Sequence, residues 1–164
     1  MSNERAEFSE FFQASWEPCL RAVLTVVGSQ QQAEDQVAEG FARAWASWRK
    51  VSCHPAPQAW VVRTALNTGA SWWRRRNREL PLAGHDLPAA PPGGGADAAL
   101  LTALRRLSAR QREVIALRIF LDLDTGTISQ QLGIEAGTVR MHLSKAVAAL
   151  RRELTLINTS EAEQ

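Results

Sequence analysis

Histidine and cysteine are scarce in this sequence, and their scarcity removes several classes of function. The three histidines, His54, His85 and His142, are scattered along the chain, and the two cysteines, Cys19 and Cys53, do not stand at metal-ligand spacing. No nucleophile arrangement, phosphate-binding loop or metal-ligand cluster is recognisable. We therefore expect a protein that is not an enzyme and that holds neither a metal nor another cofactor.

Long apolar runs are also missing. No segment approaches the roughly 20 apolar residues that are needed to span a bilayer, and the acidic N-terminal stretch has no apolar signal core. Two unpaired thiols suit a reducing compartment. The sequence therefore predicts a cytoplasmic protein that has no membrane partner.

Charge of one sign is not in excess, because the formal net charge is only +2. A balance this small does not by itself indicate binding to nucleic acid. An apolar content of 45% with 22% charged residues is ordinary for a chain that folds around a core. The placement of local basic clusters is therefore more informative than the total charge.

Proline and glycine are concentrated in one segment, residues 81–95, with the sequence PLAGHDLPAAPPGGG. This composition provides few amide donors and little apolar surface, which is typical of a linker. We expect the linker to cover residues 80–96. It would separate one domain at 1–79 from a second at 97–156, which is followed by a tail at 157–164.

Before the linker, apolar residues recur at helical spacing in three segments. The first runs from Phe8 to Val27 and contains Pro18, which is expected to kink or interrupt it. The second is expected to open at Glu34 and Asp35, whose charges suit a helix N-terminus, and the third covers about 58–78. Three tryptophans stand at apolar positions of these segments and are expected in the core: Trp45, Trp48 and Trp60.

After the linker, a short apolar helix is expected at 100–107, followed by a helix that starts with a capping box at 108–111. Asp124 is placed to cap a further short helix, and Gly133 stands where a left-handed residue would end it. The last helix is expected at about 136–154. No strand pattern competes, so the sequence predicts an all-α protein built as two helical units.

The segment 128–145 combines a short helix, a turn with glycine and a longer basic helix, which is typical of a helix-turn-helix. Buried apolar residues would lock the two helices together and leave the polar side of the second free to enter a major groove. Arg140 and Lys145 would then reach DNA. An ordinary helical hairpin with solvated charges remains an alternative at this point.

A second basic cluster, SWWRRRNR at 71–78, alternates aromatic rings with cations. Its arginines can neutralise phosphates, and a tryptophan ring can stack on an unpaired base for roughly 1–3 kcal/mol. The alternative is that Trp72 or Trp73 packs in the core while the arginines form a solvated helix end. Composition alone leaves both interpretations open.

Several of these segments together resemble a known family. The residues 107–114 (LSARQREV) and 132–140 (LGIEAGTVR) are similar to region 4 of sigma factors. The segments 32–35 (QAED), 41–45 (FARAW) and 60–67 (WVVRTALN) resemble region 2 of extracytoplasmic-function (ECF) sigma factors of the sigma-70 family, in particular the small actinobacterial branch. The resemblance implies an alternative sigma factor that binds core RNA polymerase and directs promoter-specific transcription initiation. It also implies a region-2-like bundle at 1–79 and a region-4-like helix-turn-helix at 97–156.

The resemblance assigns residues to three contacts. Those expected to read the minus-thirty-five element are Thr138, Arg140, Met141, His142, Ser144 and Lys145. Those expected at the minus-ten element are Ser52, His54, Trp60, Arg63, Asn67, Trp73, Arg74, Arg75, Arg76 and Arg78. Those expected to bind polymerase are Asp35, Gln36, Glu39 and Arg43. The implied partners are the beta-prime clamp helices and beta flap of core RNA polymerase, promoter DNA and an anti-sigma factor.

The sequence also departs from the family pattern. The run 127–129 (TIS) stands where the family usually has Glu-Ile-Ala, and it is preceded by Gly126, which lowers helix propensity by about 1 kcal/mol against alanine. Met141 and Glu135 replace residues that are commonly small and polar. Two alternatives therefore stay open: a conventional operator-binding regulator, and a sigma-like antagonist that binds polymerase without initiating transcription.

Overall fold

The structure is a computed structural model that describes the backbone of residues 2–79 and 96–162. Within these ranges, it does not describe the side chains of 70–79, 96–97 and 161. These ranges contain helices and no strand, which confirms the all-α prediction. Apart from Ala96, the predicted linker lies outside the described residues. The helices are α1 (Ser2–Val27), α2 (Gln30–Ala46), α3 (Trp48–Val51), α4 (Pro57–Glu79), α5 (Ala96–Arg105), α6 (Ala109–Ile119), α7 (Thr125–Leu132) and α8 (Ala136–Ala162).

The first group of helices, α1 to α4, differs from the prediction at two points. Helix α1 continues through Pro18 without interruption, because a buried stripe on both sides of the proline, including Ser15 and Leu20, holds the helix against its neighbours. Helix α2 starts earlier than predicted, since Ser29 is its N-cap and accepts a hydrogen bond from the amide of Gln32. Glu34 therefore lies inside the helix.

Helices α2 and α4 cross closely at a glycine. A Cβ atom at Gly40 would lie 2.9 Å from the carbonyl oxygen of Val61, so only glycine permits this approach. Around the crossing, Val37, Phe41 and Ala65 are almost completely buried. The rigid pairing of these two helices fixes the direction of α4, which carries most of the predicted minus-ten residues.

In the second group, α6, α7 and α8 begin where the sequence predicted, whereas α5 begins at Ala96 and not at the expected residue 100. Ser108 and Gln111 form the capping box of α6, and Asp124 accepts a hydrogen bond from the amide of Thr127 at the start of α7. Gly133 adopts the left-handed conformation, with φ of 64°, directly after α7. These caps define a tight connection between α7 and α8.

Helix α8 is longer than predicted, because it continues past Leu154 to Ala162. The expected helix end at about 154 was therefore wrong, and most of the expected tail is helical. The apolar residues Leu150, Leu154 and Ile157 continue the helical spacing and are half-buried. No glycine or proline stops the helix in this stretch.

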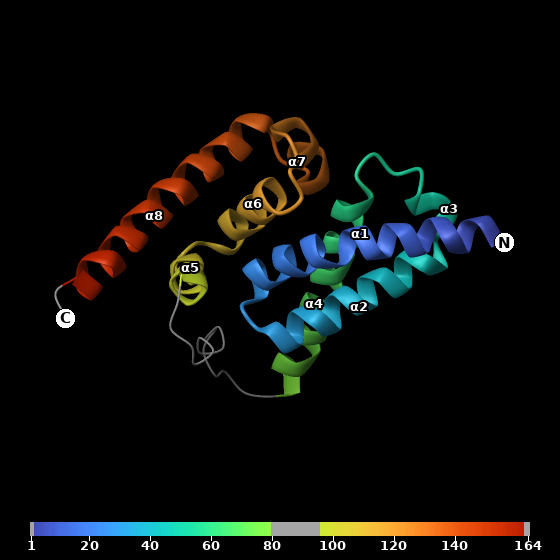
Figure 1. Ribbon diagram of the computed structural model, residues 1–164, viewed down its shortest axis with the longest axis horizontal. Helices are drawn as coiled ribbons and strands as arrows, with labels where there is room; N and C mark the ends of the chain where they lie inside the picture. Colours follow the sequence, from blue (N-terminus) through green and yellow to red (C-terminus); the bar gives the residue numbers. More distant parts are fainter. Residues whose placement is uncertain (1, 80–95, 163–164) are drawn as a thin grey trace.

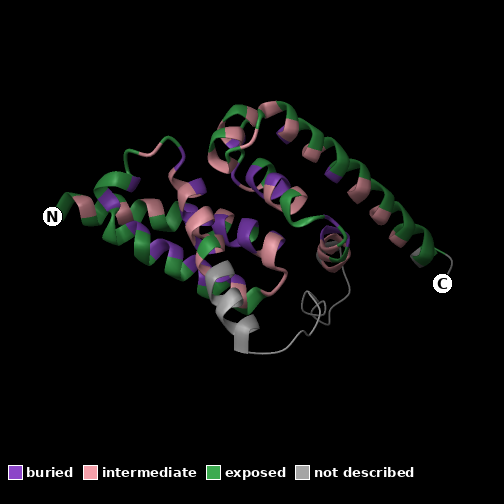
Figure 2. Ribbon diagram, turned by 180° about the vertical axis from the view of Figure 1, so that it is seen from behind, coloured by how far each residue is buried: buried purple, intermediate pink, exposed green. Residues whose placement is uncertain are grey.

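The two groups of helices lie against each other. Helix α6 packs beside α1 (Figure 1), and buried residues of both groups form one continuous cluster that includes Val23 and Val62 as well as Ala116 and Leu117. Figure 2 shows buried residues on both groups and mostly exposed residues along the outer side of α8. Within 2–79 and 96–162, every helix is too short or too polar to cross a lipid bilayer.

Candidate nucleic-acid interface

Helices α7 and α8 form a helix-turn-helix that is held from the inside. Ile128 in α7 and Val139 in α8 are completely buried where the two helices meet. The hydroxyl of Ser129 donates a hydrogen bond of 2.6 Å to the carbonyl oxygen of Ile134, which ties the end of α7 to the turn. Despite Gly126, α7 is a regular helix over eight residues. The angle between the two helices therefore rests on packing and on bonds within the turn.

The outward side of the first turns of α8 carries most of the residues predicted to read the minus-thirty-five element. Arg140, Ser144 and Lys145 are exposed, and Met141 has 44% of its surface exposed. An exposed methionine beside cations can make an apolar contact with the methyl group of a thymine. An exposed helix side with cations and a polar residue is of the kind that enters a major groove.

Two other residues of that prediction are less available. Thr138 and His142 are half-buried, and the Nδ1 atom of His142 is buried without a hydrogen-bond partner in the described part of the chain. A half-buried histidine at this place supports the helix from its inner side more than it offers an edge to a base. The exposed set is therefore smaller than the predicted one.

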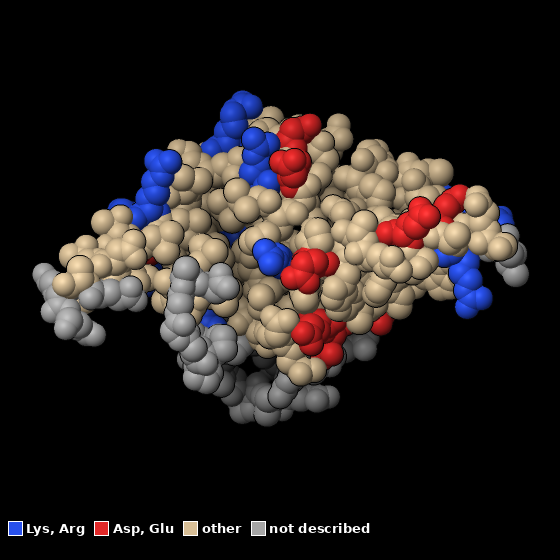
Figure 3. Space-filling model, viewed as in Figure 1, with Lys and Arg blue, Asp and Glu red and all other residues tan. Residues whose placement is uncertain are grey.

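Positive charge follows α8. Lysine and arginine side chains gather along the edge of the molecule that this helix forms (Figure 3). The exposed cations on α8 include Lys145, Arg151 and Arg152. Within the side chains that the structure describes, these three form no ion pair. Of these three, Lys145 lies nearest the first turns of α8, and an unpaired exposed cation there can contact a phosphate.

The connection between α3 and α4 is the predicted place of minus-ten recognition, and it is shaped by its own hydrogen bonds. His54 Nδ1 accepts a hydrogen bond of 3.0 Å from the amide of Ala56, and the hydroxyl of Ser52 donates to the carbonyl oxygen of Arg49. Ser52 and Cys53 are exposed at the tip. The imidazole of His54 thus orients the loop while Ser52 faces outward.

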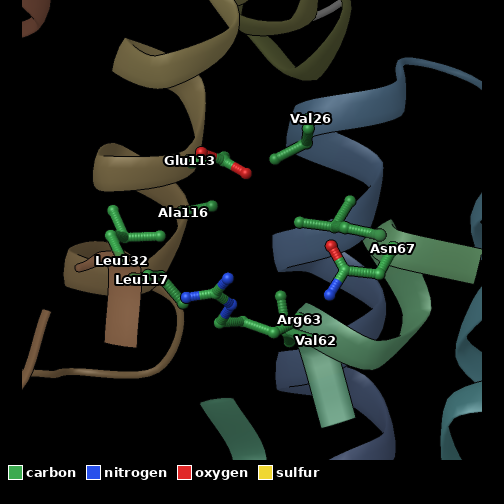
Figure 4. Close-up of a pocket in the computed structure, with 9 residues that line it drawn as sticks. Val26, Val62, Arg63, Asn67, Glu113, Ala116, Leu117 and Leu132 are labelled. Carbon is green, nitrogen blue, oxygen red and sulfur yellow. The ribbon is translucent and has the colours of Figure 1, made fainter. Parts of the chain in front are cut away.

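The predicted minus-ten residues on α4 fall into three situations. Trp60 is half-buried and packs on the edge of the core of the first helix group. Arg63 and Asn67 stand one turn apart and line a small cavity toward the second group, where Glu113 of α6 lies on the opposite side (Figure 4). The side chains of the remaining five, Trp73, Arg74, Arg75, Arg76 and Arg78, lie outside the described residues.

Three of the four residues predicted to bind polymerase are exposed on α2. Asp35, Glu39 and Arg43 lie on its outer side, and the guanidinium of Arg43 is 2.8 Å from the carboxylate of Glu39. The expectation for Gln36 is corrected, because it is only 7% exposed and packs over Gly69 of α4. Its side chain fills the space that the glycine leaves and is not available to a partner.

The structure also corrects the expectation for Trp45, which is 45% exposed and not in the core. Its ring centroid lies 5.1 Å from that of Phe8, and Phe12 beside it on α1 is also exposed. The core positions of α2 are 37, 41, 44 and, beyond the helix, 48, so the periodicity places residue 45 at the edge of the buried stripe. That spacing was the signal that could have identified Trp45 as a surface aromatic.

The two cysteines also differ in how far they are buried. Cys19 is completely buried, and the loss of solvation raises the pKa of its thiol to about 12. Cys53 is exposed in the loop before α4. A group of three or more potential metal ligands is absent from the portions of the chain that the structure describes. Cys19 is therefore a residue of the core, and Cys53 is a residue of the surface.

Comparison with known proteins gives the same two regions. A family model described as sigma-70 region 2 matches residues 15–79, and one described as sigma-70, region 4 matches residues 97–150. The RNA polymerase sigma-E factor of Streptomyces coelicolor is 31% identical over 92% of this chain and 88% of its own length. The ECF RNA polymerase sigma factor SigL of Mycobacterium tuberculosis is 32% identical with the same coverage of both chains.

A solved structure has the same arrangement of helices. The sigma factor RpoE of Bartonella quintana, solved in complex with the anti-sigma factor NepR, superimposes with a TM-score of 0.75. The match covers 91% of this chain and 97% of that chain at 22% sequence identity. At this identity the likeness concerns the arrangement of the helices alone.

Proposed function

Because the chain belongs to the ECF group of sigma-70 RNA polymerase sigma factors, we propose that it binds core RNA polymerase and directs promoter-specific transcription initiation. The observation that carries this proposal is the α7–α8 pair, which presents Arg140, Met141 and Lys145 outward from a buried apolar support. A rigid helix with such a side is what reading of duplex DNA requires.

In this proposal the C-terminal unit recognises the minus-thirty-five element. Arg140 and Lys145 would contact bases or phosphates in the major groove, with Ser144 beside them and Met141 against an apolar base edge. Thr138 and His142 would act mainly by holding the helix. Glu135, which is exposed just before α8, would repel a phosphate placed there and so restrict how the helix enters the groove.

The N-terminal unit would recognise and open the minus-ten element. The loop carrying Ser52 and His54 would receive an extruded base, while Arg63 and Asn67 would contact the strand from α4. Extrusion costs a few kcal/mol, which a fitted pocket and charge contacts must offset. The aromatic and basic end of α4, residues 73–78, would add stacking and phosphate neutralisation.

The exposed side of α2, with Asp35, Glu39 and Arg43, is proposed to dock on the beta-prime clamp helices, and the C-terminal unit is proposed to contact the beta flap. The predicted linker at 80–96 would let the two units reach these two separate sites on the polymerase. An anti-sigma factor is a further proposed partner, by analogy with the relative solved in such a complex. A protein with these partners would work in the cytoplasm.

Copurification with core RNA polymerase tests the proposal against its alternatives. We expect the tagged chain to retain core polymerase, and the double variant Asp35→Lys and Glu39→Lys to lose it while remaining folded. An operator-binding regulator would bind duplex DNA without retaining polymerase. An antagonist would retain polymerase but give no specific transcript in a reconstituted reaction.

A further inference from the structure

We propose that His54 selects the base that is captured by the loop between α3 and α4, residues 52–56, and that it does so through the N–H group at Nε2. The captured base must then turn a hydrogen-bond acceptor toward this group. The inference rests on the proposed function, because that function brings an extruded minus-ten base to the loop. It adds which atom of the loop makes the choice and which chemistry of the base is chosen.

The imidazole of His54 has a fixed tautomer. A backbone amide can only donate, so the hydrogen bond of 3.0 Å from the amide of Ala56 requires a lone pair on Nδ1. A neutral imidazole that accepts at one ring nitrogen carries its proton on the other. The Nε2 atom of His54 is therefore a donor for as long as the hydrogen bond to Nδ1 holds.

The N–H group at Nε2 is free to meet a ligand. Among the described residues, Nε2 of His54 donates no hydrogen bond, and it is not one of the buried polar atoms that lack a partner. The residue is half-buried. One edge of the ring thus supports the loop, while the other edge is reachable from solvent.

The other side chains of the loop offer no comparable donor. The hydroxyl of Ser52 donates to the carbonyl oxygen of Arg49, which leaves the hydroxyl oxygen as an acceptor. Cys53 has only a weak donor in its thiol, and Pro55 has none. The strong side-chain donor that this loop can give to a base is thus that of His54.

The backbone on both sides holds His54 in place before a ligand arrives. The amide of His54 donates a hydrogen bond of 3.0 Å to the carbonyl oxygen of Val51, which is completely buried. Helix α4 starts at Pro57, and the amide of Trp60 donates to the carbonyl oxygen of Ala56 at 3.1 Å. A donor that is fixed in this way loses little freedom on binding, so it can discriminate between bases.

A fixed donor separates bases of the same size. At the two inner positions of its Watson–Crick edge, cytosine has a ring nitrogen that accepts and an amino group that donates, whereas thymine has a ring N–H that donates and an oxygen that accepts. Adenine and guanine differ in the same way. A base that turned its own donor toward Nε2 would leave both donors unpaired, which is costly in a site without water. We therefore expect discrimination within one pair of equal size at one minus-ten position.

Two variants separate the roles of the two ring nitrogens. In His54→Asn the amide oxygen can replace Nδ1 as acceptor for Ala56, as asparagine does in turns, but no donor reaches the position of Nε2. In His54→Gln the longer side chain brings an amide N–H about as far as Nε2, whereas the loop loses its acceptor. Both replacements are neutral, so they do not change the general attraction for DNA relative to the neutral imidazole.

The test uses holoenzyme assembled from core RNA polymerase and the full chain, bound to promoter fragments whose minus-ten element is already unpaired. Each of the four bases is placed in turn at each position of this element, and the ratio of affinities within each same-size pair is measured. We expect wild type to separate one pair by about tenfold at one position. His54→Gln should keep most of this ratio with weaker binding overall, and His54→Asn should reduce it by about threefold or more.

The matched control is Cys53→Ala, which changes the exposed neighbour of His54 and should keep the wild-type ratio. An unchanged ratio in His54→Asn, or an equal loss in His54→Gln or in the control, would overturn the proposal, because His54 would then act only by shaping the loop. Wild type without discrimination inside any same-size pair would also overturn it. Failure of the sigma-factor function itself would appear elsewhere, as wild-type chain that does not support transcription with core polymerase.

Discussion

At the scale of single residues, Arg140 is the side chain on which promoter reading depends most. It is exposed on the side of α8 that the α7 packing leaves free. We expect Arg140→Ala to reduce promoter binding by the assembled holoenzyme by about 1–3 kcal/mol, because a charged base or phosphate contact is lost. Core polymerase binding should persist.

The measurement for this prediction is electrophoretic mobility of holoenzyme on a promoter fragment, together with copurification of core polymerase. Arg151→Ala is the control, since Arg151 is exposed on the same helix but lies beyond the part that matches sigma-70 region 4. Equal losses in the two variants would show that α8 contributes only general positive charge. Loss of polymerase binding in Arg140→Ala would contradict the assignment of the C-terminal unit.

Asp124 provides a prediction about pH. Its carboxylate accepts a hydrogen bond of 2.7 Å from the amide of Thr127, and this bond lowers the pKa of Asp124 below its ordinary value of 3.8. The folded state therefore favours the charged form. This contribution to stability is complete above the unfolded pKa and is lost as the pH falls through the folded pKa.

Asp124→Asn is the informative variant, because asparagine also caps helices but does not titrate. We expect the difference in unfolding free energy between wild type and this variant to be constant near neutral pH and to shrink below about pH 4. Urea unfolding at a series of pH values measures it. A difference that stays the same down to about pH 3 would show that the charge of Asp124 has no part in capping α7.

At the scale of helices, the two glycines Gly40 and Gly126 give opposite predictions. A methyl group at Gly40 would lie 2.9 Å from the carbonyl oxygen of Val61, so Gly40→Ala must push α2 and α4 apart. A methyl group at Gly126 would have Asp124 Oδ1 at 3.5 Å, an ordinary contact within a helix. The first site is overpacked by alanine and the second accommodates it.

We therefore expect Gly40→Ala to lower the free energy of unfolding by about 1–3 kcal/mol. Gly126→Ala should raise it by about 0.4–1 kcal/mol, since alanine reduces the freedom of the unfolded chain and favours helix. Urea denaturation of both variants checks the pair. Stabilisation by alanine at Gly40 would contradict the close crossing of α2 and α4.

The starts of α6 and α7 and the end of α7 were predictable from the sequence, because a cap is a local interaction. The capping box at Ser108 and the caps at Asp124 and Gly133 follow from residues that are at most four positions apart. The continuation of α1 through Pro18 was not predictable in this way. It depends on packing against helices that are distant in the sequence, which outweighs the local cost of a proline.

Side-chain exposure was predicted less well than helix position. Gln36 was expected on the surface and lies inside, because its place is decided by Gly69 on another helix. Trp45 was expected inside and is half-exposed, because Phe41 of α2 and Trp48 of α3 already fill the core there. A single-helix pattern identifies a buried stripe, whereas residues at its edge are sorted by what packs against them.

At the scale of the whole molecule, the contact between the two helix groups could not be read from the sequence. The apolar positions of α6 indicate that it buries one side, but they do not distinguish packing within its own unit from packing against α1. The resemblance to sigma factors identified both regions and their order along the chain. The structure adds that Arg63 and Asn67 face Glu113 across the contact.

The central claim is that this chain programs core RNA polymerase to start transcription at specific promoters. Run-off transcription from a randomised promoter library, with purified core polymerase and this chain, tests it most directly. We predict that the transcribed templates are enriched in two separated sequence elements upstream of the start, and that Arg140→Ala weakens selection of the upstream element only. Transcripts that depend on the chain but show no enriched elements, or no transcripts at all, would contradict the account.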